Sequence, residues 1–174
     1  MKRRRFLGGL GATFLAPPVF AIDYLSFDEA RALLFPGATA FVPMTLDGAA
    51  SRLAQPVPRP RLARLRAYDV RANEARAGYV VADAVIGKFE YIDYAVALAP
   101  DFTIRQVEIL AYRESHGHEI RQSAWRAQFQ GKGPADSLRL NDDIRNVSGA
   151  TLSCSHVTDG VRTIVALVRE AATR

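Results

Sequence analysis

A long stretch rich in branched and aromatic residues, spanning 65–112, most constrains the fold of this 174-residue chain. Such residues favour pleated, half-buried strands, and they gather in four segments: 67–70, 79–86, 91–98 and 103–112. Gly87-Lys88 and Pro100-Asp101 lie between the last three segments, where turns are expected. We therefore predict that these three segments pair as an antiparallel meander.

The clearest predicted helix closes the chain. Its apolar residues recur at spacings of three and four, which places them on one buried stripe: Val157, Val161, Ile164, Val165 and Val168. A second helix is predicted over about 119–129, where Trp125 and Phe129 lie one turn apart. The pattern predicts a single α+β domain, an antiparallel sheet with helices packed on it.

The segment before the meander mixes helix, strand and loop signals. Ser26-Phe27-Asp28-Glu29 forms a capping box that opens a short helix with an apolar face, and Pro36-Gly37 ends it; the apolar residues are Ala30, Leu33 and Leu34. A strand is predicted over 38–44 and a surface loop over 55–61. The arginines between positions 52 and 76 alternate with apolar residues, which indicates a solvated sheet face rather than a basic patch.

The first 21 residues have the layout of a bacterial export signal. Lys2-Arg3-Arg4-Arg5-Phe6-Leu7 contains a twin-arginine pattern, an apolar run follows over 6–15, and Val19-Phe20-Ala21 ends in a small residue. We predict cleavage after Ala21, a mature chain of 22–174, and a periplasmic location. The alternative is an uncleaved anchor, but the apolar run is well short of the ~20 residues that span a membrane.

Removing this segment changes the charge balance. The whole chain carries a net charge of +5, whereas residues 22–174 hold 19 basic and 18 acidic side chains. The composition therefore gives no argument for binding nucleic acid. Cys154 is the only cysteine, which excludes an internal disulfide. We interpret Cys154 as a small residue packed in the first turn of the last helix.

A small-residue turn precedes that helix. Ser148-Gly149-Ala150-Thr151 places a hydroxyl at or just before the helix N-terminus. Free backbone N–H groups and the positive end of the helix dipole favour a phosphate at such a position. The alternative is an ordinary helix cap without a ligand.

The same turn, Ser148-Gly149-Ala150-Thr151, resembles the attachment motif of FMN-binding domains. This family includes the flavin-carrying subunits of sodium-pumping and Rnf-type electron-transport complexes. The resemblance implies that Thr151 carries FMN through a phosphoester bond, with Ser153 close to the cofactor. It also implies a maturation partner, a separate magnesium-dependent flavin transferase that takes the FMN group from FAD.

A second segment supports the resemblance. Glu114-Ser115-His116-Gly117-His118-Glu119 is similar to the Glu-Thr-Pro-Gly segment of the family, which implies that Glu114, Ser115, His116 and Gly117 lie near the flavin. The domain core is expected over about 78–172. Family members usually have Asp three residues before the serine of the attachment motif, where this chain has Arg145. Asp142 and Asp143 are the nearby carboxylates that can take its place.

His116 and His118 have the spacing of metal ligands, but only His156 could add a third imidazole. We therefore favour contact of His116 and His118 with the flavin ring over a metal site. A histidine there can change its charge near physiological pH. A solvated turn is the alternative.

These observations predict an exported electron-transfer flavoprotein that exchanges electrons with a membrane or periplasmic protein. One alternative is a module that binds a phosphorylated ligand or a protein non-covalently, without redox activity. Another is a flavoprotein that reduces a substrate of its own. The sequence contains no second set of convergent acid–base groups, so we rank this reductase third.

Overall fold

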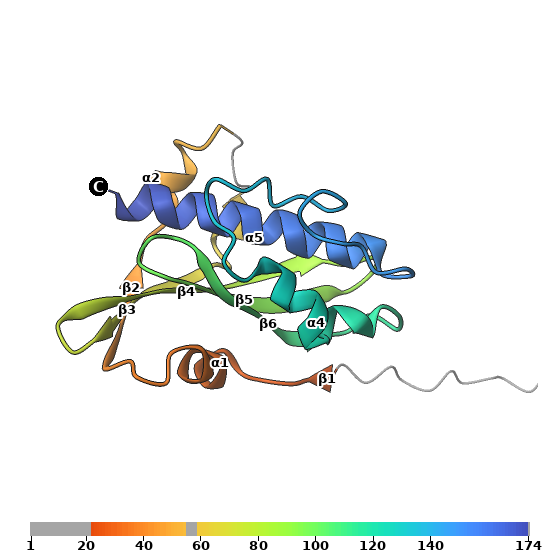
Figure 1. The fold of residues 1–174 in the computed structure, drawn as a ribbon, viewed down its shortest axis with the longest axis horizontal. Coiled ribbons are helices and arrows are strands. Elements are labelled where there is room, and N and C mark those ends of the chain that lie inside the picture. The colour runs from red at the N-terminus through yellow and green to blue at the C-terminus, as the bar shows by residue number, and fades with distance from the viewer. Residues whose placement is uncertain (1–21, 55–58, 174) are drawn as a thin grey trace, which may run out of the picture.

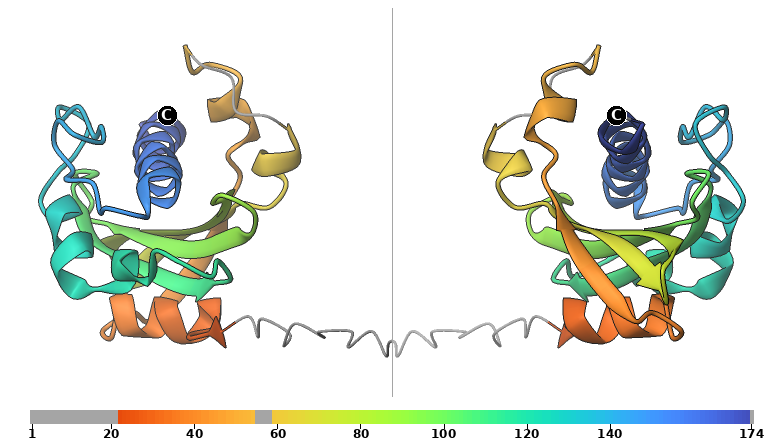
Figure 2. Two further views of the ribbon diagram at one scale, coloured as in Figure 1. Left: turned by 90° about the vertical axis from the view of Figure 1, so that its right-hand side faces the viewer. Right: turned by 90° about the vertical axis from the view of Figure 1, so that its left-hand side faces the viewer.

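The computed structural model describes residues 22–54 and 59–173, so the predicted export signal lies outside the described residues. The fold has three layers, in which the sheet lies between helix α5 (Thr151–Ala172) on one face and helix α1 (Phe27–Leu34) on the other (Figures 1 and 2). The predicted α+β class is confirmed.

The sheet has six antiparallel strands in the order β1-β6-β5-β4-β3-β2. Their bounds are β1 Ile22–Asp23, β2 Ala40–Met44, β3 Arg66–Ala72, β4 Ala75–Ile86, β5 Tyr91–Leu98 and β6 Ile104–Tyr112. The predicted meander is β4-β5-β6, with β5 at the predicted bounds. Strands β2 to β6 follow one another in chain order, and β1 pairs with β6 at the far edge.

Two apolar clusters hold the layers together. The larger one lies between the sheet and α5, and it contains all five residues of the predicted stripe. The smaller one lies beneath α1, where Phe27, Ala30 and Leu34 are buried. The capping box of Ser26 and Glu29 is confirmed, but Leu33 is 58% exposed, so its predicted place on the apolar face was wrong.

Two short helices, α2 (Asp47–Ala50) and α3 (Arg59–Leu62), flank α5. The predicted loop over 55–61 is therefore corrected in part, because α3 begins at Arg59, while 55–58 lie outside the described residues. None of the helices in the described part of the chain is long and apolar enough to cross a membrane.

The predicted helix over 119–129 is wrong as one element. It is broken into η1 (His118–Arg121), α4 (Ser123–Arg126) and η2 (Ala127–Phe129), with extended backbone at Gln122, φ −62° and ψ 137°. The predicted contact of Trp125 with Phe129 is present, at 5.2 Å between ring centroids. The indole N–H of Trp125 also donates to the Arg145 carbonyl at 2.9 Å. These tertiary contacts outweigh the local helical preference.

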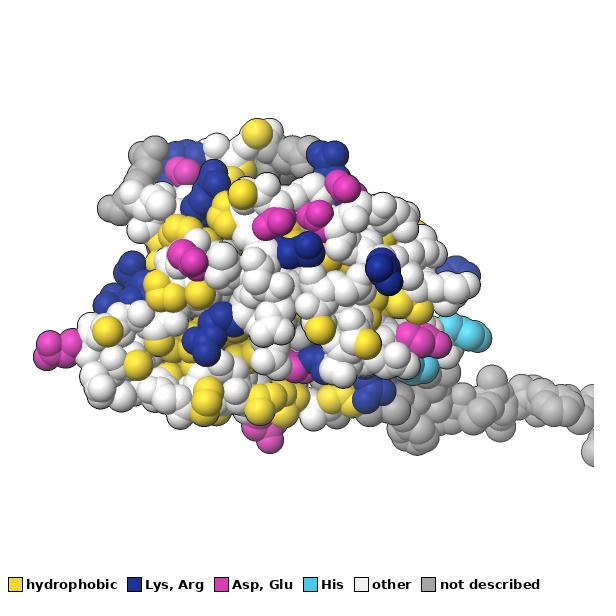
Figure 3. Space-filling model, in the orientation of Figure 1, with side chains coloured by type: hydrophobic (Ala, Val, Ile, Leu, Met, Phe, Trp, Pro, Cys, Tyr) yellow, Lys and Arg dark blue, Asp and Glu magenta, His cyan; other side chains and the backbone are white. Residues whose placement is uncertain are grey.

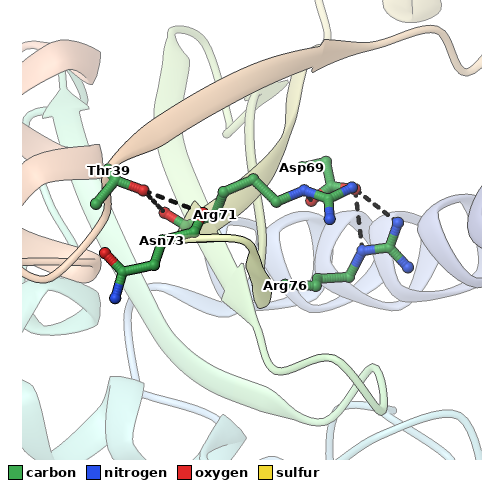
Figure 4. Close-up of polar contacts among 5 residues, drawn as sticks. All are labelled: Thr39, Asp69, Arg71, Asn73 and Arg76. Carbon is green, nitrogen blue, oxygen red and sulfur yellow. Dashed lines mark hydrogen bonds and ion pairs between the residues drawn. The ribbon is translucent and has the colours of Figure 1, made fainter.

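The arginines of the predicted solvated face form specific pairs with buried carboxylates. Asp69 is 7% exposed and accepts hydrogen bonds from Arg71 and Arg76 near the turn of the β3–β4 hairpin (Figure 4). Arg71 and Arg76 keep more than a third of their side-chain surface, so the solvated description fits them. The solvated description does not fit Arg61, which lies on α3 and not on the sheet.

Arg61 belongs to a buried polar cluster between the sheet and α5. Its guanidinium donates to Asp83 on β4 at 2.5 Å, and the Tyr94 hydroxyl on β5 donates to the same carboxylate oxygen at 2.6 Å. The side chain of Asp83 has no exposed surface. Burial, the negative charge of Asp83 and its hydrogen bond raise the pKa of Tyr94 well above its ordinary value, so its hydroxyl stays a donor.

Candidate functional site

A pocket of about 610 Å³ opens where α5 begins. Its walls are the β4–β5 turn, the segment 114–119 after β6, and the turn before α5. The lining includes all nine residues predicted to contact the cofactor: Glu114, Ser115, His116, Gly117, Ser148, Gly149, Ala150, Thr151 and Ser153. The volume lies in the range of roughly 300–1,000 Å³ that is usual for small-molecule sites.

Gly117 joins the two predicted segments. Its φ of +86° lies in the left-handed region, and a Cβ there would approach the Tyr112 hydroxyl to 2.6 Å and the Ala150 Cβ to 2.7 Å. Only glycine fits this backbone and this close approach. The segment after β6 and the turn before α5 therefore touch directly at Gly117.

Tyr112 also stabilises the contact between the segment after β6 and the turn before α5. It is 1% exposed, and its hydroxyl donates to the His116 carbonyl at 2.5 Å. The hydroxyl has one hydrogen, so Ser153 is the donor in the 3.2 Å contact between Ser153 Oγ and the Tyr112 oxygen. Burial raises the pKa of Tyr112, which keeps this arrangement protonated at neutral pH.

We expect Gly117→Ala to lower the free energy of unfolding by about 2–4 kcal/mol, because it adds backbone strain and a clash with Ala150. It should also reduce cofactor loading, since the two walls of the pocket move apart. Urea unfolding and flavin absorbance measure the two effects. Gly37→Ala is the control, because a Cβ at Gly37 meets nothing within 4 Å. Equal stability of both variants would contradict the role given to Gly117.

Glu114 holds the β4–β5 turn, the third wall of the pocket, in position. Its carboxylate is 7% exposed and accepts backbone hydrogen bonds from Phe89 at 2.6 Å and Glu90 at 3.0 Å. The β4–β5 turn is thereby tied to the strand end of β6. Burial alone raises the pKa of Glu114, but the N–H groups of Phe89, Glu90 and Lys88 outweigh burial and leave this pKa below its ordinary value.

The lowered pKa of Glu114 gives a pH-dependent prediction. A carboxyl group with a lower pKa in the folded state stabilises the fold above its unfolded pKa, and this stabilisation is lost as the pH falls through the folded value. Glu114→Gln should therefore cost about 1 kcal/mol near neutral pH and clearly less at about pH 3. Urea unfolding of both proteins at the two pH values measures the difference. A cost that is independent of pH would contradict the ionised role of Glu114.

The β4–β5 turn adds two residues that the sequence did not indicate as site residues. Lys88 and Phe89 line the pocket, and Phe89 is 71% exposed. Leu152, in the first turn of α5, also lines it and is 47% exposed. The sequence did contain one indication of this part of the site: Phe89 is an aromatic residue in a predicted turn, where core packing does not require one. These two exposed apolar side chains give the pocket surfaces that a flat ring can cover.

The turn before α5 has the features of an anion site. Gly149 has φ +82°, and a Cβ there would meet nothing within 4 Å, so open space lies above the turn. Among the residues that the structure describes, no side chain caps the N-terminus of α5, and its first turn holds no acidic residue. The backbone N–H groups and the helix dipole therefore face the pocket with no carboxylate from the first turn of α5 itself.

Thr151 is the first residue of α5, and its side chain is exposed. Its hydroxyl oxygen accepts a hydrogen bond of 2.9 Å from the Asn146 side-chain amide. The turn itself is anchored at Arg145, whose carbonyl accepts from Trp125 and whose N–H donates to Gln128 at 2.8 Å. The broken helix segment 118–129 thus supports the turn before α5.

Asp142 and Asp143, the carboxylates near position 145, each accept a hydrogen bond within the preceding loop. Asp142 accepts from the Ser137 hydroxyl at 2.7 Å, and Asp143 accepts from the Leu138 N–H at 2.6 Å. Both carboxylates stabilise the loop that precedes the turn. That either carboxylate substitutes for the family's Asp stays a prediction.

The histidines gather at the end of the molecule where α5 begins (Figure 3). His116 and His118 line the pocket, whereas His156 bonds the Ile86 carbonyl at 2.6 Å. Within 22–54 and 59–173, no group of three His, Cys, Asp or Glu side chains is placed to hold a metal ion. Cys154 is fully buried and burial raises its pKa, which makes its thiol a poor nucleophile.

Fold and pocket together define an α+β domain in which a threonine hydroxyl and a helix N-terminus line the same pocket. Residues 87–166 match the model of the FMN-binding domain family, which supports an FMN-binding domain in this part of the chain. The match begins at the β4–β5 turn, includes both predicted segments and ends within α5. No curated protein sequence matches the chain.

Proposed function

We propose that this protein is an exported electron carrier that holds FMN covalently through the Thr151 hydroxyl. The observation that carries the proposal is the position of that hydroxyl. It is exposed, it stands at the uncapped N-terminus of α5, and it lies in the pocket formed by both family segments. A non-covalent phosphoryl-binding module is the alternative that the experiments below distinguish.

The residues present fit FMN. The phosphate would lie at the first turn of α5, where Gly149 leaves open space and the helix dipole offsets part of the negative charge. The apolar surfaces of Phe89 and Leu152 would suit the isoalloxazine ring, and His116 and His118, which also line the pocket, would offer polar groups to it. The bound flavin supplies the redox chemistry, and the protein sets its exposure and orientation.

In this proposal the chain is the acceptor in a phosphoryl transfer carried out by a separate flavin transferase. A bond forms between the Thr151 oxygen and the FMN phosphorus of FAD, the bond between the two phosphates breaks, AMP leaves, and the hydroxyl proton is released. The tertiary fold provides positioning, and the transferase and its magnesium provide the charge stabilisation that such transfers need.

Export explains why a covalent link is useful. A dissociating flavin would be lost outside the cytoplasm, because no local pool would refill the site. Edman sequencing of the periplasmic protein should begin at Ile22 if the signal is cleaved after Ala21. An intact N-terminus in the cytoplasmic fraction would contradict export.

Electron carriage is tested by reoxidation of the reduced, FMN-loaded protein. A carrier should be reoxidised rapidly by membranes or a quinone-linked partner and slowly by small soluble acceptors. A reductase would turn over with a soluble acceptor, and the binding module would contain no flavin to reduce. Stopped-flow absorbance of the flavin band separates the three cases.

A further inference from the structure

The Thr151 hydroxyl differs in its hydrogen bond from the other threonine hydroxyls in and directly after α5. Thr158, Thr163 and Thr173 each donate their hydroxyl to the backbone carbonyl four residues earlier, at 2.6 to 2.8 Å. This back-bond is common for threonine in helices and fixes the side chain against the helix. The Thr151 oxygen instead accepts a hydrogen bond from the Asn146 amide at 2.9 Å.

This difference determines where the Thr151 hydroxyl points. The amide NH₂ of Asn146 is only a donor, so it occupies a lone pair of the oxygen and leaves the hydroxyl hydrogen for another group. The carbonyl four residues before Thr151 belongs to Val147, which precedes α5, and it accepts from the Ala150 N–H at 3.0 Å. Among the described residues the Thr151 hydroxyl makes no back-bond to this carbonyl, and Thr151 lines the pocket.

The position of Asn146 is fixed by its neighbour in the turn, so its amide can hold the Thr151 hydroxyl. It follows Arg145, whose N–H and carbonyl are both fixed by side chains of the segment 118–129. The amide thus projects from an anchored point of the turn, although its side chain is exposed. An exposed hydrogen bond gains rigidity when one partner is held by the fold, because less side-chain freedom is lost on forming it.

We propose that Asn146 is a positioning residue for FMN attachment, which rests on the proposed function of Thr151. Its amide selects the side-chain rotamer of Thr151 in which the oxygen faces the incoming phosphorus. The carboxylates of Asp142 and Asp143 are bonded elsewhere, so the proton released from Thr151 passes to the transferase or to solvent. Asn146 orients the acceptor and takes no proton.

Transferase kinetics test this role. Purified unmodified protein, FAD, magnesium and a flavin transferase are mixed, and FMN incorporation is followed by flavin fluorescence of the denatured protein. Asn146→Ala should lower kcat about tenfold with KM for the protein unchanged, because orientation and not docking is lost. Arg145→Ala, the neighbouring exposed side chain, should stay within about twofold of wild type. A raised KM for Asn146→Ala, or an equal loss of kcat in Arg145→Ala, would overturn the positioning role.

A second measurement needs no transferase. Three-bond NMR couplings to the Thr151 γ-methyl carbon report the side-chain rotamer directly. They should indicate one rotamer in wild type and in Arg145→Ala, and rotamer averaging in Asn146→Ala. A single rotamer that persists in Asn146→Ala would overturn the proposal. Wild-type protein that takes no FMN would overturn the proposed function itself, whereas loaded wild type with a normally loaded Asn146→Ala overturns only the role of Asn146.

Discussion

Replacing Thr151 with alanine is expected to abolish covalent FMN while leaving the domain folded. The hydroxyl is the acceptor atom in the proposed attachment, so its removal leaves no bond to form. The side chain is exposed, and among the described residues its hydroxyl bonds only to Asn146, so the free energy of unfolding should change by less than about 0.5 kcal/mol. Flavin fluorescence of the band after denaturing electrophoresis, with urea unfolding in parallel, measures both effects.

Two matched variants make the Thr151 result specific. Ser148→Ala removes the other exposed hydroxyl of the motif, and Ser153→Ala removes the buried one that bonds Tyr112. Both proteins should retain covalent flavin, although Ser153→Ala should load it less completely because the junction beneath the pocket is weakened. A fluorescent band in Thr151→Ala, or its loss only in Ser148→Ala, would move the attachment to another residue.

Gly160→Ala is expected to cost about 3–5 kcal/mol of stability. A Cβ at Gly160 would lie 2.0 Å from the Tyr94 hydroxyl and 3.2 Å from the Arg61 guanidinium. Tyr94 is fully buried, so its ring has no free space into which it can move. The added methyl must break the hydrogen bond from Tyr94 to the buried carboxylate of Asp83, or lift α5 from the sheet.

The double variant Gly160→Ala with Tyr94→Phe tests this mechanism. Removing the hydroxyl relieves the shortest contact, so the two costs should combine to less than their sum in urea unfolding. Relief should be partial, because the ring carbon next to the hydroxyl lies 2.9 Å from the added Cβ. Strictly additive costs would show that Gly160 acts through something other than Tyr94. Gly48→Ala is the control, since its Cβ meets only the flexible end of Arg52.

Sequence patterns correctly predicted the strands and helices whose conformation depends mainly on their own residues. The bounds of β5 follow directly from its branched and aromatic residues, and the stripe of α5 is buried as its spacing indicated. The capping box likewise marks the start of α1. The segment 119–129 failed because its conformation depends on distant partners, above all the hydrogen bond of Trp125 to Arg145.

Some residues of the site were likewise predictable from local sequence, and others depend on distant contacts. The residues of the two motifs were predicted through their family resemblance, and the fold brings them to one pocket. Lys88 and Phe89 were missed because Glu114 places their turn across 25 residues of sequence, through hydrogen bonds that no local pattern reveals. Asn146 was missed for a different reason, since its contact with Thr151 depends on how the turn is anchored by Trp125 and Gln128.

The most direct test of covalent attachment is the mass of the protein produced together with a flavin transferase. Intact mass should exceed that of the unmodified chain by one FMN less one water, and fragmentation of the peptide spanning 146–161 should place the addition on Thr151. Unmodified protein in the presence of an active transferase, or an addition located on another residue, would contradict the account.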